Sequence, residues 1–574
     1  MSLFRFFRKE NACHFLVNPD GRLAQKYAHF KALLENNNEA LDILAGLEQL
    51  YYGGGTFSMA AVRDATKRLS EATGELVVML NALVGNRYPD LREALARVEA
   101  GLTPHFGGTV VTGGADADPV LSLAAVDPAK AWLVGGKAAN MAVMRNQLGM
   151  PTPDGFSITS AAFEAFLNVG GLRQVVEAQL DRASPLDLED LEARCRVLRA
   201  QVMATDLPQA IATGIMAEVD RLEREAGGPV LLAMRSSAVG EDSQASFAGQ
   251  YTTILNVGRN GVLDAYKSVV ASKYTPSAIL YRLRYGLDEA DTPMCVLGLV
   301  MVPSRASGVL YTADPGGQLD PEGSPALRVN AVLGLGEQLV SGRATPDVFL
   351  LARSPLRILQ QDVSAKSERL VALADGGTSL EAVSGEEGQR ASVSEAVVLD
   401  LAARALALET HFRTPQDVEW AVDPAGRLIL LQTRPLEAAV TASDAPPPVR
   451  QADIPNPVLV SGGKTAAPGA SAGPAFVLGT AGRETMPEGA ILVARTAAPE
   501  HAALLDRAAG LVTDIGGVAS HLASVARELG LPALFDAGDA TTRIPHGQTV
   551  TLWADAAAVY EGEVSELAHA RSGR

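Results

Sequence analysis

One histidine stands in a setting that suits phosphoryl transfer. Residues 510–535 read GLVTDIGGVASHLASVARELGLPALF, so a short strand pattern runs into a Gly-Gly turn and His521 follows. The spacing predicts an amphipathic helix over residues 522–529, ended by Gly530. The free amides and the dipole at a helix start favour a bound phosphate, and a neutral imidazole is a competent nucleophile toward phosphorus. An ordinary helix cap has the same pattern, so both interpretations stay open on these residues alone.

Two earlier segments place cations beside small residues. Gly135-Gly136-Lys137 sets an ammonium next to a glycine pair, and the helical pattern of residues 138–148 points its N-terminal end at the same place. A buried-type strand over residues 230–234 then delivers Arg235 into a loop rich in serine. A guanidinium there suits bidentate contact with phosphate. Taken singly, each segment fits a surface lysine or an ordinary salt bridge equally well.

Carboxylates and an amide follow in two later segments. The tight turn Gly334-Leu335-Gly336 is followed directly by Glu337. Residues 416–435, QDVEWAVDPAGRLILLQTRP, predict a β-hairpin with a turn at residues 423–426. The hairpin carries four side chains that could converge, two on each strand: Asp417, Glu419, Gln432 and Arg434. Oxygen ligands that converge on one place suit Mg²⁺ bound together with substrate phosphates.

These blocks, in this order, resemble the ATP-grasp nucleotide-binding domain of the phosphoenolpyruvate synthase and pyruvate phosphate dikinase family. The resemblance covers about residues 125–437 and implies that ATP is bound with Mg²⁺. It implies nucleotide or phosphate contacts for Lys137, Arg235, Glu337 and Arg434. It implies metal ligation by Glu419 and Gln432, with Asp417 in support. The chain departs from the family at Leu299, where a glutamine usually lies near the adenine.

The segment around His521 resembles the swivelling phosphohistidine domain of the same family, whose signature is Gly-Gly-x-x-Ser-His. The resemblance implies that His521 is the phosphorylated residue and that Gly516, Gly517 and Ser520 support its loop. Some members have a threonine two residues before the histidine, where this chain has Ala519.

The expected fold class is multidomain, with α/β and α+β parts. We expect five segments, in chain order: an N-terminal helical domain (1–102), a linker (103–120), the ATP-grasp domain (121–437), a hinge linker (438–456) and the swivelling phosphohistidine domain (457–574). The hinge is rich in alanine and proline, which makes a semi-stiff tether.

Composition narrows the class of protein further. The 574-residue chain has a formal net charge of −17, which argues against nucleic acid as a partner because phosphate backbones need a basic surface. Three widely spaced cysteines suggest neither a disulfide framework nor a zinc site. The longest apolar run falls far short of the ~20 residues that a membrane helix needs. We therefore expect a cytoplasmic protein.

The resemblance predicts an ATP-dependent phosphotransferase in which His521 takes a phosphoryl group from ATP, with release of AMP and phosphate. Full-length synthases continue into a pyruvate-binding barrel of at least ~200 residues, whereas 53 residues follow His521 here. We therefore expect a partner subunit to bind the acceptor, pyruvate or another small molecule. Two alternatives stay open: a self-contained enzyme resembling rifampicin phosphotransferase, and a non-catalytic ATP-binding regulator.

Overall fold

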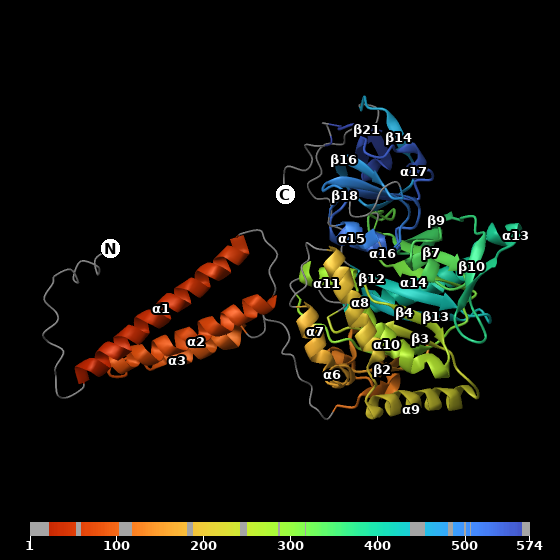
Figure 1. Ribbon diagram of the computed structural model, residues 1–574. Coiled ribbons are helices and arrows are strands. Elements are labelled where there is room, and N and C mark those ends of the chain that lie inside the picture. The colour runs from red at the N-terminus through yellow and green to blue at the C-terminus, as the bar shows by residue number, and fades with distance from the viewer. Residues whose placement is uncertain are drawn as a thin grey trace. The chain divides into compact units, whose positions relative to one another are not determined.

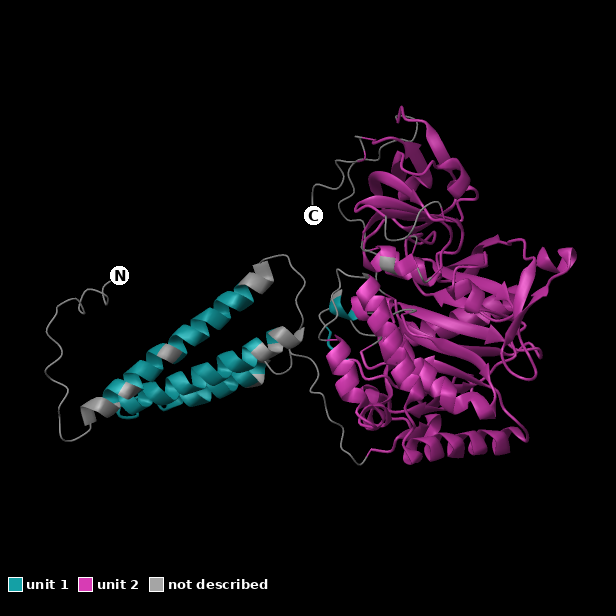
Figure 2. Cartoon of the chain, viewed as in Figure 1, with its two compact units in different colours: residues 1–112, 282–291 teal, residues 113–281, 292–574 magenta. Residues whose placement is uncertain are grey.

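The computed structural model describes most of the chain and divides it into two compact units. The described residues are 22–52, 59–102, 117–180, 188–240, 250–284, 287–315, 317–436, 454–479, 486–498, 501–505, 507–564 and 567. One unit comprises residues 1–112 and 282–291, and the other comprises residues 113–281 and 292–574 (Figure 2). The proposed domain boundaries stay predictions, and most of the expected 103–120 linker and 438–456 hinge lies outside the described residues.

The first unit contains three described helices, as the periodic apolar spacing of residues 20–102 predicts. They are α1 (Arg22–Tyr52), α2 (Met59–Val84) and α3 (Asp90–Leu102). Ala40 and Ile43 of α1 are buried, as are Ala72 and Val77 of α2. Because α1 and α2 pack along their lengths, each helix buries a stripe that it could not bury alone.

The larger unit begins with a five-stranded sheet in the order β1-β2-β5-β3-β4 (Figure 1). Its strands are β1 (Val120–Ser122), β2 (Gly155–Ile158), β3 (Leu232–Ser236), β4 (Thr253–Val257) and β5 (Val296–Val300). Its helices are α4 (Ala131–Val134), α5 (Gly136–Ala142), α6 (Ser160–Leu167), α7 (Leu172–Leu180), α8 (Leu188–Ala204), α9 (Gln209–Ala226), α10 (Val262–Ser272) and α11 (Pro276–Arg284). A π-helical turn over residues 143–147 continues α5, so the helix expected over residues 138–148 is present.

A six-stranded sheet follows, in the order β13-β12-β6-β7-β8-β9, and its neighbouring strands are antiparallel. Its strands are β6 (Ala306–Tyr311), β7 (Leu327–Leu333), β8 (Asp347–Arg353), β9 (Leu356–Asp362), β12 (Gln416–Val422) and β13 (Leu428–Pro435). A small hairpin, β10 (Glu368–Ala372) and β11 (Thr378–Ala382), and helices α12 (Glu337–Val340), α13 (Gly385–Gly388) and α14 (Glu395–Phe412) accompany it. The predicted β-hairpin of residues 416–435 is therefore β12 and β13.

The two faces of this sheet have different surroundings. On one face Val418 and Trp420 of β12 pack with Leu401 of α14 in the main hydrophobic core. Because side chains alternate along a strand, Asp417 and Glu419 point to the other face. That second face carries the candidate site.

The last part of the chain forms an eight-stranded sheet, in the order β14-β21-β20-β16-β17-β18-β19-β15. Its strands are β14 (Val458–Ser461), β15 (Lys464–Ala467), β16 (Ala470–Val477), β17 (Ala490–Thr496), β18 (Ala508–Ile515), β19 (Ala533–Phe535), β20 (Thr549–Trp553) and β21 (Ala558–Glu561). Its helices are α15 (Ala502–Leu505), α16 (His521–Glu528) and α17 (Ala540–Arg543). The expected mixed, multidomain fold class is confirmed.

Candidate functional site

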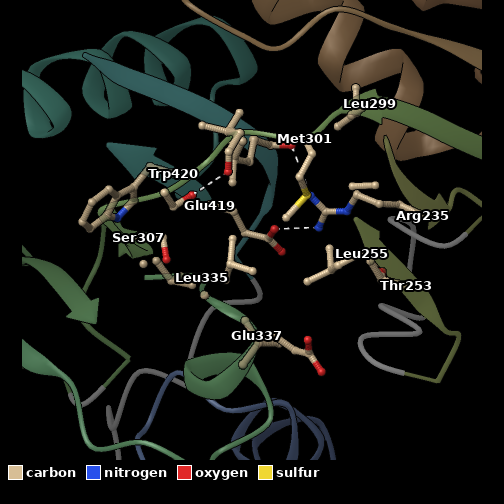
Figure 3. Close-up of a pocket in the computed structure, with 18 of the residues that line it drawn as sticks. Arg235, Thr253, Leu255, Leu299, Met301, Ser307, Leu335, Glu337, Glu419 and Trp420 are labelled. Atoms are coloured by element: carbon tan, nitrogen blue, oxygen red, sulfur yellow. Dashed lines mark hydrogen bonds and ion pairs between the residues drawn. The ribbon is translucent and has the colours of Figure 1, made fainter. Parts of the chain in front are cut away.

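A cavity of about 320 Å³ collects residues from all three sheet regions. Arg235 comes from β3, Glu419 from β12, Glu337 from the start of α12 and His521 from the start of α16. Most of the remaining lining is apolar, as the leucines, methionine and tryptophan in Figure 3 show. A slot with apolar walls and a few charged groups suits a ligand with one flat apolar part and one anionic part.

Two oxygens converge on the guanidinium of Arg235. Its Nη2 donates to Oε2 of Glu419 at 2.6 Å and to Oε1 of Gln432 at 2.7 Å, and its bond to Glu419 is visible in Figure 3. The convergence follows from register, because Glu419 and Gln432 are directly paired across the β12–β13 hairpin. Burial by itself would raise the pKa of Glu419, but the charge and hydrogen bond of Arg235 outweigh it and hold that pKa below its ordinary value.

The donor set of Glu419 and Gln432 fits a magnesium ion. A carboxylate and an amide oxygen are hard ligands of the kind that Mg²⁺ takes together with substrate phosphates. Both oxygens already lie within hydrogen-bond distance of one nitrogen of the Arg235 guanidinium, so they are close enough together to bind a single cation. Among the described residues no group of three or more histidine, cysteine or acidic side chains is placed to hold a metal ion. A site built on Glu419 and Gln432 would take its other ligands from substrate oxygens and water.

Asp417 lies in a different pair. Its Oδ2 accepts from Nε of Arg434 at 2.9 Å and from Nη2 of the same residue at 2.8 Å. Burial raises the pKa of Asp417, against the lowering effect of Arg434. The structure therefore brings Glu419 and Gln432 together on Arg235. Asp417 instead pairs with Arg434, which lies directly opposite it on β13.

The first glycine of the pair before Lys137 is required by a close approach of backbone. Gly135 has a φ of +79°, and a Cβ there would lie 1.6 Å from the carbonyl oxygen of Ser237. Lys137 then lies in the first turn of α5, and its Nζ donates to Oγ of Ser236 at 3.1 Å. The charge of Lys137 also contributes to lowering the pKa of Glu419. Lys137 and Arg434 are not among the described residues that line the cavity, although both lie near residues that do.

His521 is the first residue of α16, and the side chain of Ser520 caps that helix by accepting from the backbone N–H of Ala523 at 3.3 Å. The histidine is only 4% exposed, and its Nδ1 is buried with no hydrogen-bond partner among the described residues. Burial, followed by the nearby charge of Arg434, lowers its pKa to about 3. The imidazole is therefore neutral at physiological pH, and the ring lines the same cavity as Arg235 and Glu419.

The loop of His521 packs closely on the six-stranded sheet. Ala519 shares a small apolar cluster with Val309, Tyr311, Val332 and Leu339. Glycine permits the approach at two places. A Cβ on Gly342 would lie 2.7 Å from Cβ of Ala497, and one on Gly517 would lie 3.2 Å from Pro346. Gly516 has a φ of +145°, which glycine adopts readily.

Arg527 of α16 has a structural role, since its Nη1 donates to the carbonyl oxygens of Val518 at 3.0 Å and Ala466 at 3.2 Å. The two residues that depart from the family pattern, Leu299 and Ala519, both make apolar contacts. Leu299 lines the cavity, and Ala519 belongs to the apolar cluster.

Sequence reasoning missed several cavity residues, of which Trp420 and Ser307 illustrate the reason. Trp420 follows Glu419 directly and contributes to both the core and the cavity, beside a register shift in the strand. Ser307 is the second residue of β6 and lies 113 positions before Trp420 in the chain, but β6 is paired directly with β12. Only the pairing of these strands could have identified Ser307, because nothing in its own segment distinguishes it.

Comparison with known protein families gives two matches. Residues 131–452 match the family model described as pyruvate phosphate dikinase, AMP/ATP-binding domain. Residues 486–557 match the model described as PEP-utilising enzyme, mobile domain. The first match contains the residues on the two sheets around the cavity, and the second contains His521.

Curated relatives are named phosphoenolpyruvate synthase. The one from Aeropyrum pernix is 33% identical over 473 residues, which are 75% of this chain and 56% of the relative. A probable phosphoenolpyruvate synthase of Archaeoglobus fulgidus is 33% identical over 78% of this chain and 59% of its own length. The phosphoenolpyruvate synthase of Neisseria meningitidis is 32% identical over 73% of this chain and 55% of its own length. The matched part of the chain thus spans less than two thirds of each of these relatives.

Proposed function

Because this chain belongs to the pyruvate phosphate dikinase and phosphoenolpyruvate synthase family, we propose that it moves a phosphoryl group from ATP to His521 and then to an acceptor. One observation carries the proposal: His521 lines the same cavity as Arg235, Glu419 and Glu337. A nucleophile, a phosphate-binding cation and metal-binding oxygens thus meet in a space of about 320 Å³.

In this proposal the phosphates of ATP are held by Arg235, which lines the cavity from β3, and by Lys137, which lies in the first turn of α5 and donates to Ser236, the neighbour of Arg235. Glu419 and Gln432 hold Mg²⁺, with Glu337 across the cavity. When bound, the ion neutralises charge on the phosphate oxygens. Arg235 now donates to both of those oxygens, so it exchanges them for phosphate oxygens when the nucleotide enters. Asp417 orients Arg434 toward the histidine side of the site.

His521 acts as the nucleophile in its neutral form. Since Nδ1 is enclosed by protein, we assign the attack to Nε2. A nitrogen–phosphorus bond forms to the β-phosphorus as the bond between that phosphorus and the oxygen of AMP breaks. The γ-phosphoryl group passes to water, which gives inorganic phosphate. Arg434 lies near the ring and favours both the neutral imidazole and the negatively charged phosphohistidine.

The phosphorylated domain must then leave the cavity so that an acceptor can reach it. We propose that the acceptor is a small molecule such as pyruvate, bound by a partner subunit. Among the described residues no helix combines the length and apolar character that crossing a bilayer requires.

Incubation with ATP labelled separately at the β and γ positions tests the first half-reaction. We expect acid-labile label on the protein from the β position, together with equal amounts of AMP and phosphate. His521→Ala should abolish this label and keep ATP binding. A protein that binds ATP with Mg²⁺ but takes no label from either position would refute the proposal. Label that stays on His521 until another chain and pyruvate are added would support the partner subunit, whereas turnover by this chain alone would refute it.

A further inference from the structure

The helix that begins with His521 is held at its other end as well. Glu528 is the last residue of α16, and its Oε2 accepts a hydrogen bond of 2.9 Å from the hydroxyl of Tyr281. Tyr281 belongs to α11, which shares a small apolar cluster with α7 and α8, and is only 8% exposed. The two residues are 247 positions apart in the chain, so the contact joins separate parts of the larger unit.

This hydrogen bond is more directional than the apolar packing at the other end of the helix. Helix α16 has eight residues, which at 1.5 Å per residue separates its ends by about 10 Å. At the N-terminal end, Ala519 sits in the apolar cluster with Val309 and Tyr311, and apolar packing has little directional preference. Elsewhere on the same interface Thr345 donates to Asp536 at 3.5 Å, the upper limit of a hydrogen bond. The 2.9 Å hydrogen bond to the carboxylate of Glu528, at the far end of the helix, is directional and so can constrain how the helix axis, and with it the imidazole, faces the cavity.

We propose that Tyr281 and Glu528 are a positioning pair that holds α16 in the orientation from which His521 is phosphorylated. The inference rests on the proposed function, because it concerns the first half-reaction alone. The bond must break whenever the mobile domain leaves the cavity and form again on its return. Neither residue is among the described residues that line the cavity, so the pair acts on His521 and not on ATP.

Single-turnover phosphorylation of His521 at saturating ATP tests the pair in the full-length chain. Tyr281→Phe and Glu528→Ala should each slow it about tenfold, the size expected for a partly buried hydrogen bond to a carboxylate. The ATP concentration for half-maximal rate should stay unchanged. The double variant should be no slower than either single variant, since both remove the same bond.

Two further variants separate positioning from general damage. Glu528→Gln keeps an oxygen that accepts from Tyr281 and should restore most of the rate. Tyr560→Phe, on β21 of the same domain, removes a buried hydroxyl for which the described part of the chain offers no hydrogen-bond partner, and it should leave the rate unchanged. Thermal unfolding of each variant checks that it is folded.

The outcomes distinguish this inference from the proposed function. If the wild-type chain takes no label, the proposed function fails and the pair has nothing to position. If the wild-type chain is phosphorylated and Tyr281→Phe is equally fast, or if the two single effects multiply in the double variant, the positioning pair is refuted while the proposed function stands.

Discussion

Acidification should weaken the docking of His521 onto the nucleotide cavity. In the docked structure burial lowers the pKa of this histidine to about 3, whereas an imidazole exposed after the domain swings away has its ordinary pKa of about 6.5. Below that ordinary pKa the undocked form therefore binds a proton that the docked form excludes. Lower pH must favour the undocked form, and the effect must disappear above about pH 7.

The size of the effect follows from the two pKa values. At pH 5.5 an exposed imidazole is about ten parts protonated to one part neutral, while the buried ring is still neutral because its pKa is about 3. The docking equilibrium should therefore be about tenfold weaker at pH 5.5 than at pH 8, which is about 1.4 kcal/mol. Each further unit of acidification should cost about another factor of ten until the pH approaches 3.

Quenched-flow measurement of histidine phosphorylation between pH 5 and 8, at saturating ATP and Mg²⁺, would detect the weaker docking. The phosphorylation rate should fall at the pH where the docked form no longer outnumbers the undocked form. ATP affinity of His521→Asn over the same range serves as the control, since that variant has no imidazole to protonate. A rate that rises on acidification, or that stays constant to pH 5 while a distance probe reports unchanged docking, would contradict the buried neutral ring.

Three substitutions make further predictions. Glu419→Gln should raise the Mg²⁺ concentration for half-maximal phosphorylation by about tenfold or more, because it replaces a charged carboxylate by a neutral amide; an unchanged magnesium titration would exclude Glu419 as a ligand. Gly342→Ala should slow phosphorylation and keep ATP affinity, because its Cβ would lie 2.7 Å from Cβ of Ala497. If the variant were phosphorylated as fast as the wild-type chain, the two loops could separate at little cost in free energy. Gly135→Ala should lower the free energy of unfolding in urea by about 3 kcal/mol or more, because a Cβ 1.6 Å from the carbonyl oxygen of Ser237 would push the two backbone segments apart. A variant as stable as the wild-type chain would refute that contact.

Patterns within about twenty residues could be predicted from sequence because their causes are local. The helix expected over residues 522–529 is α16, which begins one residue earlier at His521 and ends before Gly530, and its ends depend on hydrogen bonds between near neighbours. The β12–β13 hairpin likewise places Glu419 opposite Gln432 through its own turn and register. The helices of residues 20–102 follow from apolar periodicity alone.

What the sequence by itself determined is therefore the set of reactive side chains and the element that presents each of them. The tertiary structure alone decided which of them meet. Arg235 is 184 residues from Glu419 and 197 from Gln432, yet its guanidinium lies between them, while Asp417, two residues from Glu419, is bound to Arg434 instead. The physical reason is that strand pairing and domain docking are set by burial and register over the whole larger unit. No short segment contains that information, and the contact of Tyr281 with Glu528 has no local signal at all.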